Sequence, residues 1–165
     1  MKKGFVILVC ALMLSGCGVQ DTFETLADDD AVSAMATAAK VELRLPEEAA
    51  APSMENEDGS KLYLCDGYTV TVQTLDGGDL GRTVQQVSGF SKEELTVMQT
   101  KKNGLDSYEM AWCAAGEGED QICRGVILDD GKYHYAVTVM ANYSQAGALR
   151  QTWQSILDSV TLSTD

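Results

Sequence analysis

The stretch YHYAVTVMA, residues 133–141, followed by QTWQSILDSV, residues 151–160, carries most of the information about the fold. The first segment is rich in aromatic and β-branched residues, which predicts a strand with alternating faces. In the second segment the apolar residues fall at helical spacing, which predicts a helix from about residue 144 that covers the sheet. One strand face holds Tyr133, Tyr135, Val137 and Val139, and the other holds His134, Ala136, Thr138 and Met140. One helix face holds Leu149, Trp153, Ile156, Leu157 and Val160.

Two more strands are predicted directly before this stretch, at residues 107–113 and 122–128. A loop rich in Gly and acidic residues, 114–120, joins the two. Asp130-Gly131 then supplies a tight turn into the last strand. Strands that follow one another through short turns predict an antiparallel meander. Within the first of these strands the large apolar side chains share one face: Tyr108, Met110 and Trp112.

The residues before the meander contain further strands and one short helix. Leu80, Val84 and Val87 fall at helical spacing, with Asp79 ahead as N-cap and Gly89 behind as C-cap. The alternating strand segments are 40–45, 61–65, 68–75 and 95–100, the second and third joined at Asp66-Gly67. The fold class is therefore α+β, with an antiparallel sheet of about five to six strands covered by one short helix and one C-terminal amphipathic helix.

The N-terminus predicts an export signal and a lipid anchor. Two lysines precede the apolar run Phe5–Leu14, which is too short to span a bilayer. The run ends in Leu14-Ser15-Gly16-Cys17, which resembles a bacterial lipobox. This resemblance implies that residues 1–16 are removed as a signal peptide and that the thiol of Cys17 receives diacylglycerol. Two or three acyl chains hold a protein stably on a membrane.

We therefore expect three parts in the chain. Residues 1–16 are the signal, residues 17–39 are the lipidated cysteine and an acidic, Ala-rich tether, and residues 40–165 are a single α+β domain. A short helix within the tether is an alternative. The expected location is the cell membrane, with the domain facing away from the cytoplasm.

The charge of the chain restricts its partners. The net charge is −13, and removal of Lys2 and Lys3 with the signal leaves 10 basic against 25 acidic residues, or −15. Nucleic-acid binding depends on Lys and Arg that neutralise phosphates, so we expect no nucleic-acid partner. Anionic lipid attracts polybasic segments, so we also expect the domain to be held off the bilayer surface.

Three cysteines remain after Cys10 leaves with the signal and Cys17 is lipidated: Cys65, Cys113 and Cys123. Cys113 and Cys123 flank the 114–120 loop, and a pairing centred on Gly118 would put both on one face. We therefore predict a cross-strand disulfide between Cys113 and Cys123. A pair that includes Cys65 and three free thiols are the alternatives. A Cys₃His zinc site is disfavoured because the spacings are irregular.

His134 is the only histidine, so any Cys-His or Ser-His mechanism would need it. The simpler interpretation is a packed or surface histidine between two tyrosines. No Gly-x-Ser-x-Gly elbow, P-loop, dinucleotide fingerprint, HExxH or EF-hand series occurs in the sequence. We therefore expect no catalytic set, no cofactor and no metal. An envelope hydrolase or thiol-redox enzyme that uses His134 with a cysteine is the alternative.

The phrases Tyr133–Val139 and Trp153–Val160 resemble the end of PsbP-like and Mog1-like domains, where an aromatic-rich strand leads into a similar helix. This resemblance implies an adaptor or accessory module and no catalyst. The whole chain is similar to small lipoproteins of gut Clostridia, a likeness that implies a location and no reaction. We therefore expect a surface lipoprotein that binds an envelope protein or a small ligand.

Overall fold

The structure of the protein, a computed structural model, describes residues 37–163. The predicted signal peptide, Cys17 and nearly all of the predicted tether lie outside the described residues. Ala38 begins the compact unit that holds all the described helices and strands. Its first strand, β1, covers Lys40–Glu42.

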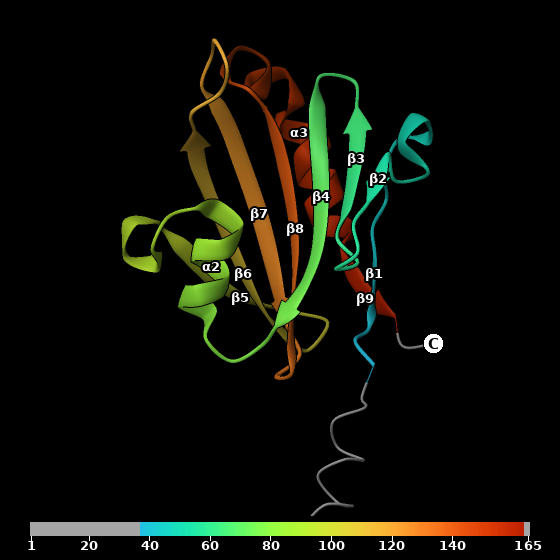
Figure 1. Ribbon diagram of the computed structural model, residues 1–165, viewed down its shortest axis with the longest axis vertical. Helices are drawn as coiled ribbons and strands as arrows, with labels where there is room; N and C mark the ends of the chain where they lie inside the picture. Colours follow the sequence, from blue (N-terminus) through green and yellow to red (C-terminus); the bar gives the residue numbers. More distant parts are fainter. Residues whose placement is uncertain (1–36, 164–165) are drawn as a thin grey trace, which may run out of the picture. The chain divides into compact units, whose positions relative to one another are not determined.

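Seven antiparallel strands form the main sheet, in the order β2-β3-β4-β8-β7-β6-β5 (Figure 1). The class predicted from the sequence is confirmed, and the sheet has more strands than the five to six expected. The additional strand is β2, which has two residues and lies in the segment expected to be a loop. The strands are β2 Met54–Glu55, β3 Lys61–Cys65, β4 Tyr68–Asp76, β5 Val97–Lys102, β6 Leu105–Ala114, β7 Gln121–Asp129 and β8 Tyr133–Asn142.

Tight turns set the register of the predicted hairpins. Cys65 pairs with Tyr68 across the Asp66-Gly67 turn, and Gly67 has a φ of 77°, a value that glycine adopts without strain. Asn103 and Gly104 both have positive φ, as a two-residue hairpin turn of the primed type requires. The meander β6-β7-β8 is therefore formed by local pairings, whereas β4 reaches β8 only through a long connection.

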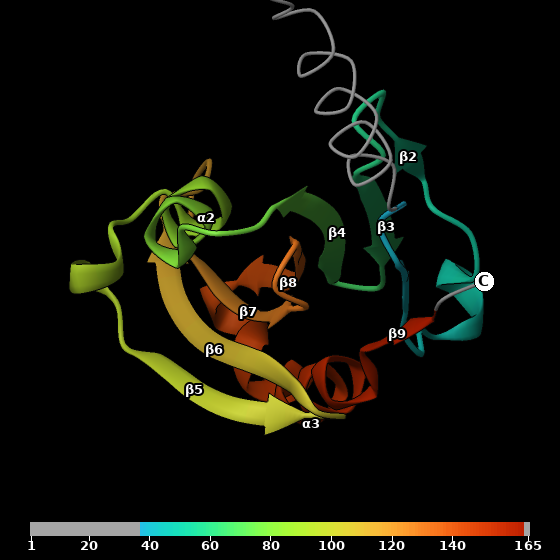
Figure 2. The same ribbon diagram turned by 90° about the horizontal axis from the view of Figure 1, so that it is seen from below.

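Two helices cover opposite faces of the sheet (Figures 1 and 2). The short helix α2 covers Leu80–Ser88, with Asp79 as N-cap and Gly89 as left-handed C-cap, as predicted. The long helix α3 covers Tyr143–Ser159. Two 3₁₀ turns, η1 Glu47–Ala49 and η2 Lys92–Glu94, lie in the connections.

Strand β8 separates two cores because it lies at the centre of the sheet. Tyr135, Val137 and Val139 pack with Trp153 of α3 in the larger core. Ala136 on the other face packs with Val84 of α2 in the smaller core. Both faces of β8 are thus covered, which explains why its sequence is apolar at nearly every position.

A separate two-stranded sheet pairs β1 with β9, Thr161–Ser163. The strand β9 was not predicted from the sequence. The chain leaves α3 at Val160 and runs antiparallel to β1, so that Val41 lies opposite Leu162. The predicted strand 40–45 is therefore shortened to Lys40–Glu42, the part that finds a partner. Three residues are too few to show a period in the sequence.

The structure contradicts the predicted disulfide between Cys113 and Cys123. The β6-β7 register pairs Cys123 with Trp112 and Cys113 with Ile122, one residue away from the pairing centred on Gly118. A shift of one residue turns a side chain to the opposite face of the sheet. Cys123 is consequently buried beside Trp112, Cys113 is exposed, and both are free thiols, as is Cys65.

Candidate functional site

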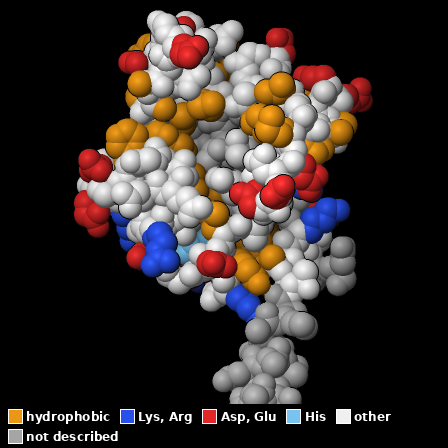
Figure 3. All heavy atoms as spheres, in the orientation of Figure 1, with side chains coloured by type: hydrophobic (Ala, Val, Ile, Leu, Met, Phe, Trp, Pro, Cys, Tyr) orange, Lys and Arg blue, Asp and Glu red, His pale blue; other side chains and the backbone are white. Residues whose placement is uncertain are grey.

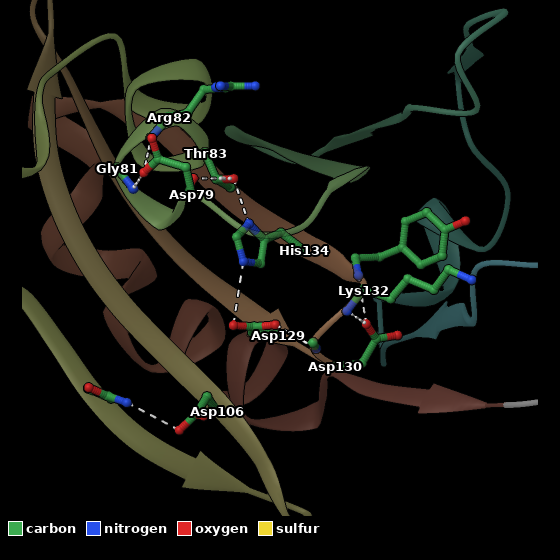
Figure 4. Close-up of polar contacts among 12 residues, drawn as sticks. Asp79, Gly81, Arg82, Thr83, Asp106, Asp129, Asp130, Lys132 and His134 are labelled. Carbon is green, nitrogen blue, oxygen red and sulfur yellow. Dashed lines mark hydrogen bonds and ion pairs between the residues drawn. The ribbon is translucent and has the colours of Figure 1, made fainter. Parts of the chain in front are cut away.

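His134 lies in the sheet beneath α2 and is completely buried (Figure 4). Its Nδ1 lies 2.6 Å from the hydroxyl oxygen of Thr83 on α2. Its Nε2 faces Asp129 Oδ2 at 3.5 Å, which is ion-pair distance but too long for a hydrogen bond, so Nε2 has no hydrogen-bond partner. The three side chains form a row from hydroxyl to imidazole to carboxylate.

Local sequence places each member of this row. Asp79 caps α2 by accepting from the backbone N–H groups of Gly81 and Arg82, so Thr83 enters the first turn of the helix on its buried side. Asp129 lies directly opposite His134 in the β7-β8 register, because the chain reverses through Asp130-Gly131. The row therefore depends on one helix cap and one hairpin turn.

The order of the row is that of a nucleophile, a base and an orienting acid. Thr83 is only 3% exposed and His134 is 0% exposed, so a substrate has no approach to the hydroxyl in this conformation. The row joins α2 to the sheet across the smaller core. Among the described residues, no cysteine or serine hydrogen-bonds to His134, so the thiol partner of the alternative enzyme hypothesis is not brought to it.

A second polar cluster holds the beginning of the domain. The hydroxyl of Tyr135 accepts from the backbone N–H of Ala39 at 2.9 Å and donates to Asp130 Oδ2 at 2.7 Å. Burial alone would raise the pKa of Asp130. Hydrogen bonds from the backbone N–H of Tyr133, the Tyr135 hydroxyl and the backbone N–H of Lys132 outweigh burial and hold this pKa below its usual value.

A surface cavity of about 660 Å³ lies where α3 crosses β7. This volume is typical of sites for small molecules. Arg124 and Ile122 contribute from β7, and Arg150, Trp153 and Gln154 contribute from α3. The remaining lining residues are at the start of the helix: Tyr143, Ser144, Ala146 and Gly147.

Two arginines give this cavity its charge. Arg124 Nη2 donates to Gln154 Oε1 at 3.1 Å. Among residues 37–163, no carboxylate lies within ion-pair distance of Arg124 or Arg150. Figure 3 shows the opposite face of the sheet, which carries α2, and there acidic side chains are spread over the surface among groups of hydrophobic ones.

The sequence analysis did not single out either arginine. Arg124 interrupts an otherwise apolar strand, between Cys123 and Gly125, and a charge within such a run is a signal for a partly open face. Thr83 and Asp129 were missed as well, because neither neighbours His134 in the sequence. In the part of the chain that the structure describes, no group of three or more His, Cys, Asp or Glu side chains is arranged to hold a metal ion.

Within residues 37–163, neither helix is long and apolar enough to cross a membrane. No protein-family model matches the chain, and no curated protein matches it in sequence.

Solved structures show the fold of the domain. LpqN, involved in cell envelope biogenesis of Mycobacterium tuberculosis, is 10% identical with a TM-score of 0.51, over 79% of this chain and 88% of that chain. A protein of unknown function and putative regulator from Pseudomonas aeruginosa is 11% identical with a TM-score of 0.51, over 76% and 99%. A Bacteroides thetaiotaomicron protein is 10% identical with a TM-score of 0.53. The match covers 76% of this chain but only 46% of the Bacteroides protein.

The Ran-binding protein Mog1p of Saccharomyces cerevisiae and PsbP of Synechocystis also match, with TM-scores of 0.48 and 0.43. The matches thus include both groups named in the resemblance drawn from the sequence. Because both TM-scores lie below 0.5, these two structures carry no argument about function.

Proposed function

We propose that the protein is a membrane-anchored lipoprotein of the bacterial envelope whose α+β domain binds a small ligand or an envelope protein and catalyses no reaction. The observation that carries the binding role is the open cavity between α3 and β7, with its two unpaired guanidinium groups. The one constellation with the order of a catalytic row, Thr83-His134-Asp129, is closed to solvent at the hydroxyl and the imidazole.

The anchor rests on the lipobox at Leu14–Cys17, which lies outside the described residues. LpqN is involved in envelope biogenesis, and its fold is shared by this domain, but 10% identity transfers no role. The accessory role in an envelope assembly is therefore proposed from two features, the predicted lipid anchor and the cavity between α3 and β7.

Metabolic labelling with palmitate in the native host tests the anchor. We expect the wild-type chain to carry label in the membrane fraction and the Cys17→Ala variant to lose the label and accumulate as unprocessed precursor. Cys10→Ala is the matched control, because it removes a cysteine of the signal segment and leaves the lipobox intact. Label that persists in Cys17→Ala would overturn the anchor.

Thermal unfolding of the protein in the presence of fractionated envelope metabolites tests the binding role. A ligand that binds the folded state raises the unfolding temperature in proportion to its occupancy. Absence of any shift, together with no envelope protein recovered by cross-linking in intact cells, contradicts a binding module.

A further inference from the structure

We infer that the cavity between α3 and β7 binds a small organic oxyanion, a carboxylate or phosphate group on an apolar body, through Arg124 and Arg150. This inference rests on the proposed binding role and names the ligand class for it. It follows from the placement of the two guanidinium groups, from the charge around them and from the apolar part of the lining.

Gln154 relates the two arginines in space. Arg150 and Gln154 are four residues apart on α3, so their side chains lie on the same side of the helix, about 6 Å apart along its axis. Arg124 reaches the same Gln154 from β7 with a hydrogen bond of 3.1 Å. Arg124 and Arg150 are therefore both neighbours of Gln154, and both line one cavity.

The charges in this cavity are unusual for the chain. It has four arginines, at positions 44, 82, 124 and 150, within a net charge of −13, and two of them line this site. Carboxylates lie near the site, but none of them is within ion-pair distance of the two guanidinium groups. Asp158 accepts from Gln154 Nε2 at 2.8 Å, Glu119 accepts from the N–H and the hydroxyl of Ser144 in the lining, and Glu109 lines a neighbouring cavity with Arg124. Guanidinium forks bind carboxylates and phosphates with paired hydrogen bonds. Here neither fork is held by a carboxylate of the described residues, and Arg124 gives one hydrogen bond to the Gln154 amide.

The rest of the lining accepts an apolar body. Ile122 and Trp153 belong to the lining, and Trp153 is 1% exposed with an indole N–H that has no hydrogen-bond partner. Gly147 leaves space at the rim, because a Cβ built there meets no atom within 4 Å. A second cavity of about 200 Å³ also has Arg124 in its lining, together with Met98, Leu157 and the acidic residue Glu109. An oxyanion at the arginines can thus be joined to an aromatic or short aliphatic group.

Calorimetric titration of the full chain carrying Cys17→Ala tests the inference and keeps it separate from the lipid anchor. The probes are 3-phenylpropionate, 2-phenylethyl phosphate and the neutral 3-phenylpropionamide. We expect at least one of the two anions to bind about tenfold more tightly than the amide, with an affinity that falls as salt is added. Which anion binds identifies the oxyanion.

Two kinds of variant locate the site. Arg124→Gln and Arg150→Gln should each weaken anion binding about tenfold, whereas Arg82→Gln, which removes the same charge from α2, should leave the affinity within about twofold. Gly147→Leu fills the cavity, favours the helix and should abolish binding of every probe. Ala148→Leu, which borders a different cavity, is its control.

Three results would overturn the inference: no binding of either anion, equal binding of the amide, or an Arg82→Gln loss as large as that of Arg150→Gln. Any of these leaves the lipid anchor standing, because labelling at Cys17 is measured independently. If the arginine variants fail to fold, Gly147→Leu decides between a ligand in this cavity and adventitious binding elsewhere.

Discussion

The hydroxyl oxygen of Thr83 on α2 lies 2.6 Å from Nδ1 of His134 on β8, and both side chains are buried. This is a buried polar contact between the short helix and the sheet, among the apolar contacts of the smaller core. Its loss would leave a ring nitrogen without a partner in the interior, which costs more than the net value of the hydrogen bond itself.

Thr83→Val should therefore destabilise the fold although it preserves the shape of the side chain. We expect the free energy of unfolding to fall by about 1–3 kcal/mol, from the desolvation of the unpaired His134 Nδ1. Urea unfolding monitored by circular dichroism measures the change. Thr138→Val, on the same face of β8 and partly exposed, is the matched control and should change stability by less than about 0.5 kcal/mol. Equal effects of the two substitutions would show that Thr83 and His134 do not depend on each other.

Asp130 should make stability depend on pH in the acid range. Its folded-state pKa is lowered, so its contribution is complete above the unfolded value of about 4 and is lost as the pH falls through the folded value. Asp130→Asn should destabilise the protein at pH 7, and its difference from wild type should shrink toward pH 3. Thermal unfolding across this range measures the difference. A pH-independent effect of Asp130→Asn contradicts the prediction.

Cys113 and Cys123 should differ in reactivity and should not be cross-linked to each other. Burial raises the pKa of the Cys123 thiol to about 11, whereas Cys113 is exposed. Since the thiolate is the reactive form, iodoacetamide at pH 8 should modify Cys113 well before Cys123. Peptide mass spectrometry of the labelled, unreduced protein measures both sites. A peptide that joins Cys113 to Cys123 would contradict the β6-β7 register.

The disulfide prediction was wrong because the sequence does not determine the register between β6 and β7. Alternation placed Tyr108, Met110 and Trp112 on one face correctly, because that depends only on the period of a strand. Whether Cys113 and Cys123 lie on the same face of the sheet depends on where the loop between them turns. A turn centred half a residue away from Gly118 reverses the outcome, and the Gly-rich sequence accommodates both closures.

The candidate sites depended on topology in the same way. The chain passes from β4 through α2 to β5 at the far edge of the sheet, and this crossover brings Thr83 over His134. Local signals fixed the helix, its caps and the strand, but the sequence holds no pattern that pairs positions 83 and 134. The cavity of Arg124 and Arg150 likewise exists only because α3 folds back across β7.

Lys102 at the end of β5 should stabilise the end of α3. Its Nζ donates to the backbone carbonyl of Leu157 at 2.8 Å, in the last turn of the helix, where a positive charge is favourable. The same carbonyl also accepts a longer bond of 3.4 Å from the N–H of Val160. Burial lowers the pKa of Lys102, and the nearby carboxylates of Asp158 and Glu109 oppose that shift. Lys102→Met keeps the aliphatic stem and removes the charge and the donor. We expect it to lower the free energy of unfolding by about 1–2 kcal/mol.

Lys101→Met is the matched control for that substitution. Lys101 is exposed and pairs with Asp106 at 2.9 Å, and an exposed ion pair contributes about 0–1 kcal/mol. Hydrogen exchange at the backbone amides of the last turn of α3 separates the two effects: exchange should accelerate in Lys102→Met and not in Lys101→Met. Strand β5 lies at the edge of the sheet, whereas α3 covers the centre of the sheet. Unchanged exchange in Lys102→Met would therefore contradict the prediction, because β5 and the last turn of α3 would then open independently of the Lys102–Leu157 contact.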